Sequence, residues 1–259
     1  GLSKTVSLGK RRRECQAEPK HTFETDKDDH CETSEEAYDD ISVFLCRLAS
    51  ILGKTPKDLA IYDPYYCNGA VVKHLAARGF GNVYNKNEDF YRTIAEGRVP
   101  HYDVCVTNPP YSGDHIERML KFCVESSKPF FCLVPNYVYS KPYYDPLTEK
   151  CRPFYLIPEN RRYEFWTPGG FRKQSLREKK TSPFISFWYC HAGEQTAALI
   201  KWWRKRTCFD SVDKSTVLVQ NLRLLPHRVK ATFDKNRKRL RKKQRISIKL
   251  KSGKKSVPE

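Results

Sequence analysis

An apolar strand, a glycine-containing loop and a helix follow one another in the first third of the chain, and this succession is what most limits its possible folds. Residues 59–62 form an apolar run of strand length and lead into a loop at residues 63–70. Val71, Val72 and Leu75 then recur at the spacing of an inward-facing helix stripe. A strand, a loop of this kind and a helix open dinucleotide-type α/β folds.

The rest of the chain continues to alternate strand-like and helix-like segments. Thr33-Ser34-Glu35-Glu36 has the form of a capping box and predicts the start of a helix. Further strands are expected at 82–85, 104–107 and 130–134, and further helices at 90–95 and 115–123. Period-two segments, typical of antiparallel strands, come last at 154–157, 162–166 and 184–189. We therefore predict an α/β fold with a Rossmann-like sheet, helices on both faces and an antiparallel closing hairpin.

Charge is distributed unevenly along the 259 residues. The chain carries 48 Lys and Arg against 30 Asp and Glu, a net charge of +18, and residues 221–259 hold 15 of the basic and 2 of the acidic side chains. Such a block is typical of a flexible tail that binds polyanions, and it also fits a nuclear or nucleolar address. We predict a charged, flexible segment at 1–32, one domain at 33–220 and a disordered basic tail at 221–259.

Apolar runs and cysteine spacing exclude two classes of protein. No run approaches the roughly 18 apolar residues that cross a bilayer, so we expect no membrane-spanning segment. The ten cysteines form no Cys-x-x-Cys pair, and several lie inside apolar runs, which favours reduced intracellular thiols over a disulfide framework. Cys15, His21, His30 and Cys31 are spaced too irregularly for a zinc site, so we expect no metal.

The most informative segment is the apolar strand at 102–107, which ends in Asn108-Pro109-Pro110-Tyr111. This order places a polar amide, a rigid turn with a free carbonyl and an aromatic ring at the carboxyl edge of the sheet. Open α/β sheets bind their ligands at that edge. Taken alone, the four residues would also fit an ordinary strand end with a proline turn and a packed tyrosine.

The segment resembles motif IV of class I S-adenosylmethionine-dependent methyltransferases that act on a planar nitrogen, above all the N6-adenine enzymes. In that family the cofactor loop follows the first strand and often reads Asp-Pro-x-x-Gly-x-Gly. Here Asp63-Pro64-Tyr65-Tyr66-Cys67-Asn68-Gly69 precedes Asn108 by 45 residues, with Cys67 where the first glycine is expected. The resemblance covers residues 33–190 and implies S-adenosyl-L-methionine as cofactor. Its binding residues are then Asp63, Tyr65, Cys67, Gly69, Asn87, Asp89 and Asn108.

Two of those cofactor residues come from the segment Asn87-Glu88-Asp89. It resembles the acidic motif III of the family, whose carboxylate bonds near the adenine amine of the cofactor, and this implies that role for Asp89. Asn85, Asn87 and Glu88 all compete for the ribose hydroxyls. A polar turn that caps the helix at 90–95 is an equally good interpretation of any one of them.

The resemblance also implies a mechanism. The Asn108 side-chain oxygen and the Pro109 carbonyl accept the two N–H bonds of an exocyclic amine, Tyr111 stacks on its base, and these fixed acceptors stabilise the charge that develops on nitrogen. Pro110 completes the catalytic motif. Aromatic and basic side chains that interleave downstream suit a groove for an unstacked strand, and we predict that Tyr111, Tyr137, Arg161, Arg162 and Trp166 bind the substrate.

The expected activity is that of a nucleic-acid adenine N6-methyltransferase, with RNA, including ribosomal RNA, favoured over DNA because of the basic tail. Protein glutamine N5-methylation and guanine N2-methylation use the same motif and stay open as alternatives. A catalytically silent fold that binds RNA is a third. The sequence leaves open whether a partner protein is required.

Overall fold

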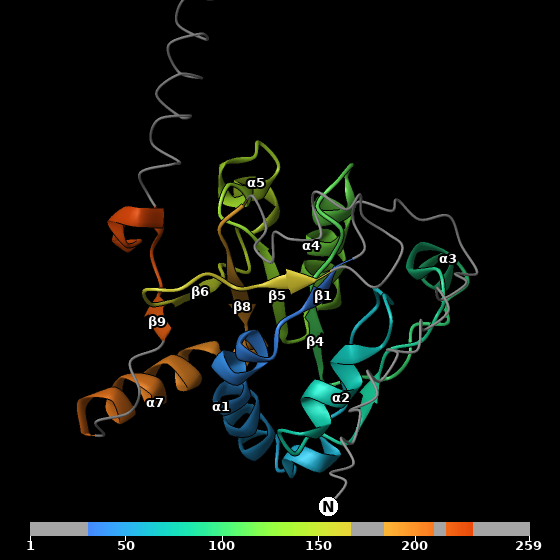
Figure 1. The fold of residues 1–259 in the computed structure, drawn as a ribbon, viewed down its shortest axis with the longest axis horizontal. Coiled ribbons are helices and arrows are strands. Elements are labelled where there is room, and N and C mark those ends of the chain that lie inside the picture. Colours follow the sequence, from blue (N-terminus) through green and yellow to red (C-terminus); the bar gives the residue numbers. More distant parts are fainter. Residues whose placement is uncertain (1–30, 167–183, 210–215, 230–259) are drawn as a thin grey trace, which may run out of the picture.

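The chain, described here from a computed structural model over residues 31–166, 184–209 and 216–229, forms a mixed α/β fold around a seven-stranded sheet (Figure 1). The strands lie in the order β3-β2-β4-β5-β8-β6-β9. Their bounds are Ile61–Tyr62 for β2, Val83–Tyr84 for β3, Val104–Thr107 for β4, Phe130–Pro135 for β5, Phe154–Pro158 for β6, Ser186–His191 for β8 and Thr216–Val219 for β9.

The sheet is parallel in one half and antiparallel in the other. Strands β3, β2, β4 and β5 pair in parallel, whereas β8 runs antiparallel to both β5 and β6, and β9 runs antiparallel to β6. The predicted antiparallel pairing of segments 154–157 and 184–189 is therefore confirmed.

The segment at 162–166 was expected in the same sheet, and that prediction is wrong. Its strand β7, Phe165–Trp166, pairs instead with β1, Glu32–Thr33, in a separate two-stranded ribbon. Asp40 of the first helix explains the departure, because its carboxylate binds both Arg161 and Tyr163 and so draws the segment away from the sheet.

Helices cover both faces of the sheet, as predicted. Helices α1 (Glu35–Ile51), α2 (Ala70–Ala76) and α7 (Thr196–Phe209) pack on one face, and α3 (Phe90–Ala95), α4 (His115–Ser126) and α5 (Tyr144–Leu147) on the other. Successive strand side chains point to opposite faces. In β4, for example, Val104 and Val106 join the first core and Cys105 joins the second.

Two details at the helix starts differ from the sequence prediction. Helix α1 begins directly after Ser34, so the predicted helix start is confirmed, but the side-chain hydrogen bonds of a capping box do not form, and Asn108 donates to the Thr33 hydroxyl instead. In α2, Val71 and Leu75 are buried but Val72 is 37% exposed. Positions one apart on a helix do not share a face, so a stripe that buries Val71 turns Val72 outward.

The chain changes direction across the sheet next to β2. It passes from β2 through α2 to β3 on one side, and then through α3 to β4 on the other side of β2. Open α/β sheets bind ligands beyond the carboxyl ends of the strands at such a reversal. No helix within the described residues has the length and apolar character to span a membrane.

Candidate functional site

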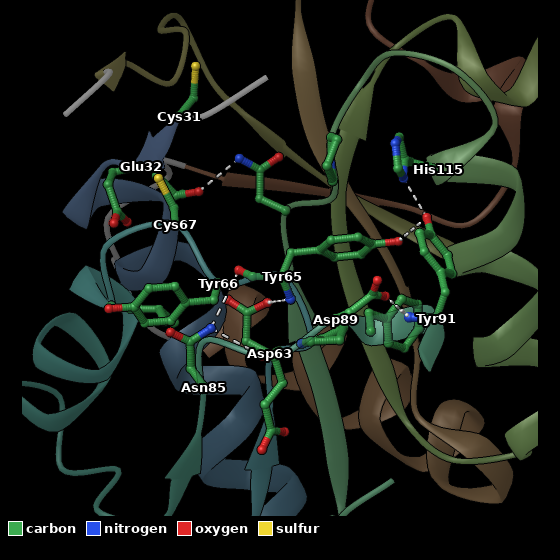
Figure 2. A pocket seen from close by; sticks show the side chains of 18 of the residues that line it. Cys31, Glu32, Asp63, Tyr65, Tyr66, Cys67, Asn85, Asp89, Tyr91 and His115 are labelled. Carbon is green, nitrogen blue, oxygen red and sulfur yellow. Dashed lines mark hydrogen bonds between the residues drawn. The ribbon is translucent and has the colours of Figure 1, made fainter. Parts of the chain in front are cut away.

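A pocket of about 310 Å³ lies at this reversal (Figure 2). The residues that directly follow three parallel strands line it, namely Asp63 after β2, Asn85 after β3 and Asn108 after β4. Its volume lies at the lower end of the range for small-molecule sites. Of the predicted cofactor residues, six line the pocket: Asp63, Tyr65, Cys67, Gly69, Asp89 and Asn108.

Asp63 forms the floor of the pocket and is 6% exposed. One carboxylate oxygen, Oδ1, accepts hydrogen bonds from Thr107 Oγ1 at 2.6 Å and from the Tyr65 amide at 3.2 Å. Burial raises the pKa of Asp63 to about 7, with a smaller contribution from the nearby Glu32 carboxylate and in spite of the two hydrogen bonds, which lower it. Asp63 is therefore an acid that changes charge near neutral pH.

Glu32 is a pocket residue that sequence reasoning missed. Its Oε1 accepts hydrogen bonds from the backbone amides of Asn68, at 2.7 Å, and Ala70, at 3.5 Å, where helix α2 begins. Gly69 between them has φ +76°, a conformation that side chains disfavour. The Cys67 thiol faces the same carboxylate, and burial together with Glu32 raises the pKa of Cys67 well above its usual range.

Carboxylic acids outnumber basic side chains in the pocket lining. Glu32, Asp63, Glu88 and Asp89 line it, and Arg118 is the only lysine or arginine among its lining residues. Carboxylates gathered in a cleft attract cations and groups with positive charge. The pocket therefore suits a ligand that carries positive charge on at least one end.

The residues after β3 differ in their place relative to the pocket. Asn85 and Glu88 line the pocket, whereas Asn87 does not. Asn85 donates from Nδ2 to the carbonyls of Asp63, at 3.1 Å, and Tyr65, at 3.4 Å, while its buried Oδ1 has no partner among the described residues. Of the three candidates for the ribose hydroxyls, Asn85 and Glu88 therefore lie at the pocket and Asn87 does not.

Asp89 caps a helix and also lines the pocket. Its Oδ1 accepts from the amides of Tyr91, at 2.8 Å, and Arg92, at 3.1 Å, and so caps helix α3. The same carboxylate lines the pocket. Both capping bonds use one oxygen, which leaves the other for a ligand.

Hydrogen-bonded aromatic side chains line the pocket next to Asp89. The Tyr65 and Tyr91 hydroxyls lie 3.0 Å apart, the Tyr91 hydroxyl lies 2.5 Å from His115 Nδ1, and the Arg118 guanidinium stands 3.4 Å over the Tyr91 ring. Sequence reasoning selected only Tyr65 of this group. His115 and Arg118 follow motif IV on one turn of α4, and that proximity was the signal available for them.

Asn108, the first residue of motif IV, lines the pocket, whereas Tyr111, the fourth, does not. Asn108 donates from Nδ2 to Thr33 Oγ1 at 3.1 Å, and its buried Oδ1 has no partner among the described residues. Pro110 also lines the pocket, whereas Pro109 is buried behind it. The Tyr111 hydroxyl lies 3.2 Å from Ser186 Oγ and 3.4 Å from the Leu133 carbonyl.

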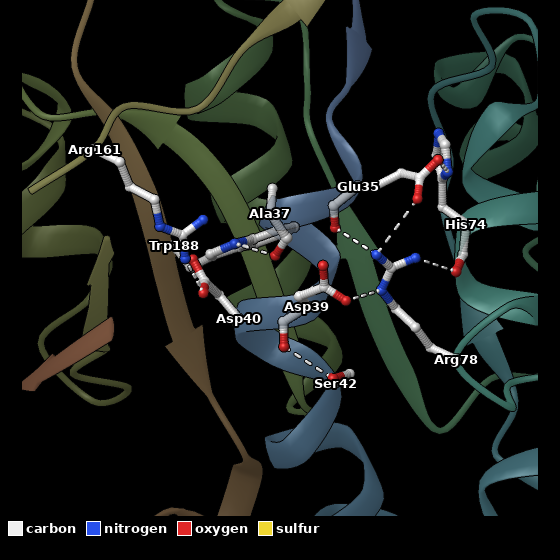
Figure 3. Close-up of polar contacts among 9 residues, drawn as sticks. All are labelled: Glu35, Ala37, Asp39, Asp40, Ser42, His74, Arg78, Arg161 and Trp188. Atoms are coloured by element: carbon white, nitrogen blue, oxygen red, sulfur yellow. Dashed lines mark hydrogen bonds and ion pairs between the residues drawn. The ribbon is translucent and has the colours of Figure 1, made fainter. Parts of the chain in front are cut away.

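The other predicted substrate residues do not gather at the pocket. Arg161 pairs with the buried carboxylate of Asp40 (Figure 3). Arg162 is exposed, and Tyr137 packs edge-on against Phe184 at 5.3 Å. Trp166 lies in β7, with its side chain outside the described part of the structure.

Replacing Arg161 by alanine is expected to lower the free energy of unfolding by about 1–3 kcal/mol, because it removes a partner from a buried carboxylate. Urea unfolding measures the change. Lys150→Ala, at an exposed position, is the control and should stay within about 0.5 kcal/mol of the parent. Equal stability of the two variants would show that the Asp40 contact contributes nothing.

Metal ligands do not cluster in the described part of the chain. Within it, no group of three or more His, Cys, Asp or Glu side chains is arranged to hold a metal ion. Cys15, His21 and His30 lie outside the described residues.

Comparisons with known proteins add little to this geometry. No protein-family model matches the chain, and no curated protein matches it. One solved structure, from a study of complex assembly and conformational transition of the type I R-M system, aligns with 14% sequence identity over 86% of this chain and 67% of that chain. Its TM-score of 0.34 marks a weak likeness.

Proposed function

We propose that the chain is an S-adenosylmethionine-dependent methyltransferase that modifies the N6 amine of adenine in nucleic acid, with RNA as the preferred substrate. One observation carries the proposal. Asn108 places a buried carbonyl oxygen, to which none of the described residues donates, at the carboxyl end of β4 on the edge of a pocket that four carboxylic acids help to line. Buried polar atoms are rarely left unpaired, and leaving one so costs about 1–3 kcal/mol, which favours a functional reason for it.

The lining residues fit S-adenosylmethionine by charge and by donor type. That cofactor supplies a methyl group on a cationic sulfonium, and it also carries an ammonium group and a ribose with two hydroxyls. Asp63 and Glu32 would pair with the ammonium group, while the free oxygen of Asn85 and the Glu88 carboxylate would accept from the ribose hydroxyls. Asp89 would bind the adenine amine. Cys67 in place of the expected glycine is compatible with this arrangement, because its thiol faces Glu32.

The chemistry follows from the properties of an exocyclic amine. Its lone pair is drawn into the aromatic ring, so the amine is a poor nucleophile until both hydrogens are held. Asn108 Oδ1 and the carbonyl of the adjoining Pro109 would be the two acceptors, and no described residue donates a hydrogen bond to the first of them. As positive charge develops on nitrogen, fixed acceptors stabilise it without reorganisation, and no strong base is required.

Charge favours nucleic acid as the substrate, and the need for an unstacked base favours RNA within that class. The net charge of +18 is concentrated in the tail at 221–259, which suits a polyanion and a nuclear or nucleolar address. The target base has to leave its stack to reach Asn108, and loops of structured RNA present bases in that state. A protein substrate would benefit from the basic tail only where its own surface is acidic.

The proposal is tested by methyl transfer from labelled S-adenosylmethionine to total RNA, DNA and protein in parallel. Nucleoside analysis then identifies the product, and Asn108→Ala serves as the matched inactive control. We expect N6-methyladenosine in RNA. Label in protein would assign the glutamine alternative, and label on guanine would assign the N2 alternative. No label in any fraction, with cofactor binding proved by calorimetry, would show that the isolated chain is not a methyltransferase for these substrates.

Removing residues 230–259 is expected to weaken binding to RNA and to flatten its dependence on salt. The segment holds 13 Lys and Arg, and the slope of log affinity against log salt becomes shallower by roughly 0.7–0.9 for each phosphate that the protein no longer neutralises. The deletion starts after Val229 because that side chain is buried in the core. Titration of labelled RNA at several salt concentrations measures the slope. A slope equal to that of the full chain would mean that the tail is only an address.

A further inference from the structure

The β1–β7 ribbon touches motif IV at two points. Thr33 and Phe165 lie opposite each other in the ribbon. Thr33 accepts the hydrogen bond from Asn108, and the Phe165 ring lies edge-on to the Tyr111 ring with centroids 6.4 Å apart. One cross-strand pair therefore contacts the first and the fourth residue of Asn-Pro-Pro-Tyr.

Both ribbon residues are firmly held. Thr33 is 3% exposed and Phe165 is 4% exposed. Next to Thr33 in the same strand, Glu32 is anchored by the two amides at the start of α2. The ribbon therefore offers motif IV a fixed surface, and the contact joins residues 75 positions apart in the chain.

An asparagine amide can turn over and exchange its donor and acceptor ends, so its orientation must be set by a neighbour. A threonine hydroxyl can donate one hydrogen bond and accept others. In the structure the Nδ2 end of the Asn108 amide donates to Thr33 Oγ1 at 3.1 Å, and no described residue donates to the Oδ1 end. The Thr33 hydroxyl, acting as acceptor, therefore faces the nitrogen end of the amide.

We propose that Thr33 is a positioning residue for the proposed transfer reaction: its hydroxyl fixes the Asn108 amide with the nitrogen toward the ribbon and the oxygen toward the target amine. The inference rests on the proposed function, because it assigns to Asn108 Oδ1 the role of acceptor. It accounts for the buried oxygen without a partner among the described residues as the free end of an oriented amide.

Thr33→Val and Thr33→Ser test the inference as a matched pair. Valine keeps the shape of the side chain and removes the hydroxyl, whereas serine keeps the hydroxyl. We expect Thr33→Val to lower kcat by roughly tenfold, the scale of one hydrogen bond, with the Kd for S-adenosylmethionine unchanged within about twofold. Thr33→Ser should restore most of the rate. Equal rates in the two variants would overturn the inference, since a purely structural role would not depend on the hydroxyl.

A second measurement does not require activity. The side-chain amide signals of Asn108 in a ¹⁵N-labelled sample are assigned by their loss in Asn108→Asp. We expect Thr33→Val to shift these signals and to speed their exchange with water, and Thr33→Ser to leave them near the parent values. Unchanged signals in Thr33→Val would overturn the inference. If the signals respond as expected while the parent methylates nothing, the positioning contact stands and the proposed function fails.

Discussion

Asn108→Ala is expected to reduce the rate of methyl transfer at saturating cofactor by about 100-fold or more while cofactor binding stays nearly unchanged. Loss of a single oriented acceptor for developing charge has an effect of this size. The described side-chain contact of Asn108 is its hydrogen bond to Thr33, so the substitution leaves Asp63 and the start of helix α2 in place. Single-turnover rates and calorimetric titration of S-adenosylmethionine measure the two quantities separately.

Asn85→Ala provides the matched control, because Asn85 is the other amide in this pocket with a buried oxygen that has no partner among the described residues. It stands at the end of β3, where we assign the ribose hydroxyls, so its loss should appear as a Kd for the cofactor that rises by roughly tenfold. At saturating cofactor its transfer rate should remain close to that of the parent. If Asn108→Ala lost cofactor binding while Asn85→Ala lost only rate, the two ends of the pocket would be assigned the wrong way round.

The strand ends could be predicted from the sequence because buried parallel strands are continuous apolar runs. Strand β4 and helix α3 occupy the predicted residues 104–107 and 90–95. Once those strands are placed, the residues that follow them meet at one edge of the sheet. Asp63 and Asn108 therefore come together although 45 positions separate them.

Residues that reach the site through tertiary contacts could not be found in this way. Glu32 and Thr33 lie in an acidic stretch, and the pattern around Thr33 matches a local cap equally well. Only the pairing of β1 with β7 brings them to the pocket. Arg161 is the opposite case, since its charge beside aromatic residues predicted a substrate groove, and only the fold shows that it pairs with the buried Asp40.

Helix α7 escaped prediction for a related reason. Its core contacts come from Leu199, Ile200 and Trp203 on one side, and basic side chains at Lys201, Arg204 and Lys205 interrupt the apolar positions. Ala197 and Ala198 are exposed and add apolar residues outside the buried stripe, which weakens the two-sided pattern on which a sequence-based assignment depends.

Asp63→Asn is expected to stabilise the protein without ligand at pH 8. The unfolded chain ionises Asp63 above about pH 4, whereas burial holds the folded pKa near 7. Between these values the folded protein binds a proton that the unfolded chain has lost, so stability falls as pH rises from about 4 to 7. Above pH 7 the folded protein carries the full cost of burying the Asp63 charge, which is on the order of a few kcal/mol in the free energy of unfolding. Asparagine removes it and keeps an Oδ1 acceptor for Thr107 and Tyr65.

Thermal unfolding of parent and variant across pH 4 to 8 measures this effect. The parent should lose stability with rising pH over that range more steeply than Asp63→Asn, and the two curves should diverge most at pH 8. Thr107→Val is the control, because it removes a hydrogen bond to the same carboxylate but leaves the charge. Parallel curves for parent and Asp63→Asn would mean that Asp63 ionises in the folded protein at its ordinary pKa.

The same substitution should weaken the binding of a cationic cofactor by tenfold or more, because an amide offers no charge to its ammonium group. In the parent, affinity for S-adenosylmethionine should rise with pH through about 7 as Asp63 ionises, while in Asp63→Asn it should lose most of this pH dependence. Calorimetric titration at pH 6 and pH 8 distinguishes the two proteins. A variant both more stable and unable to bind would show that the buried acid is retained for the ligand although it destabilises the fold. Binding with equal affinity and equal pH dependence in both proteins would remove Asp63 from the site.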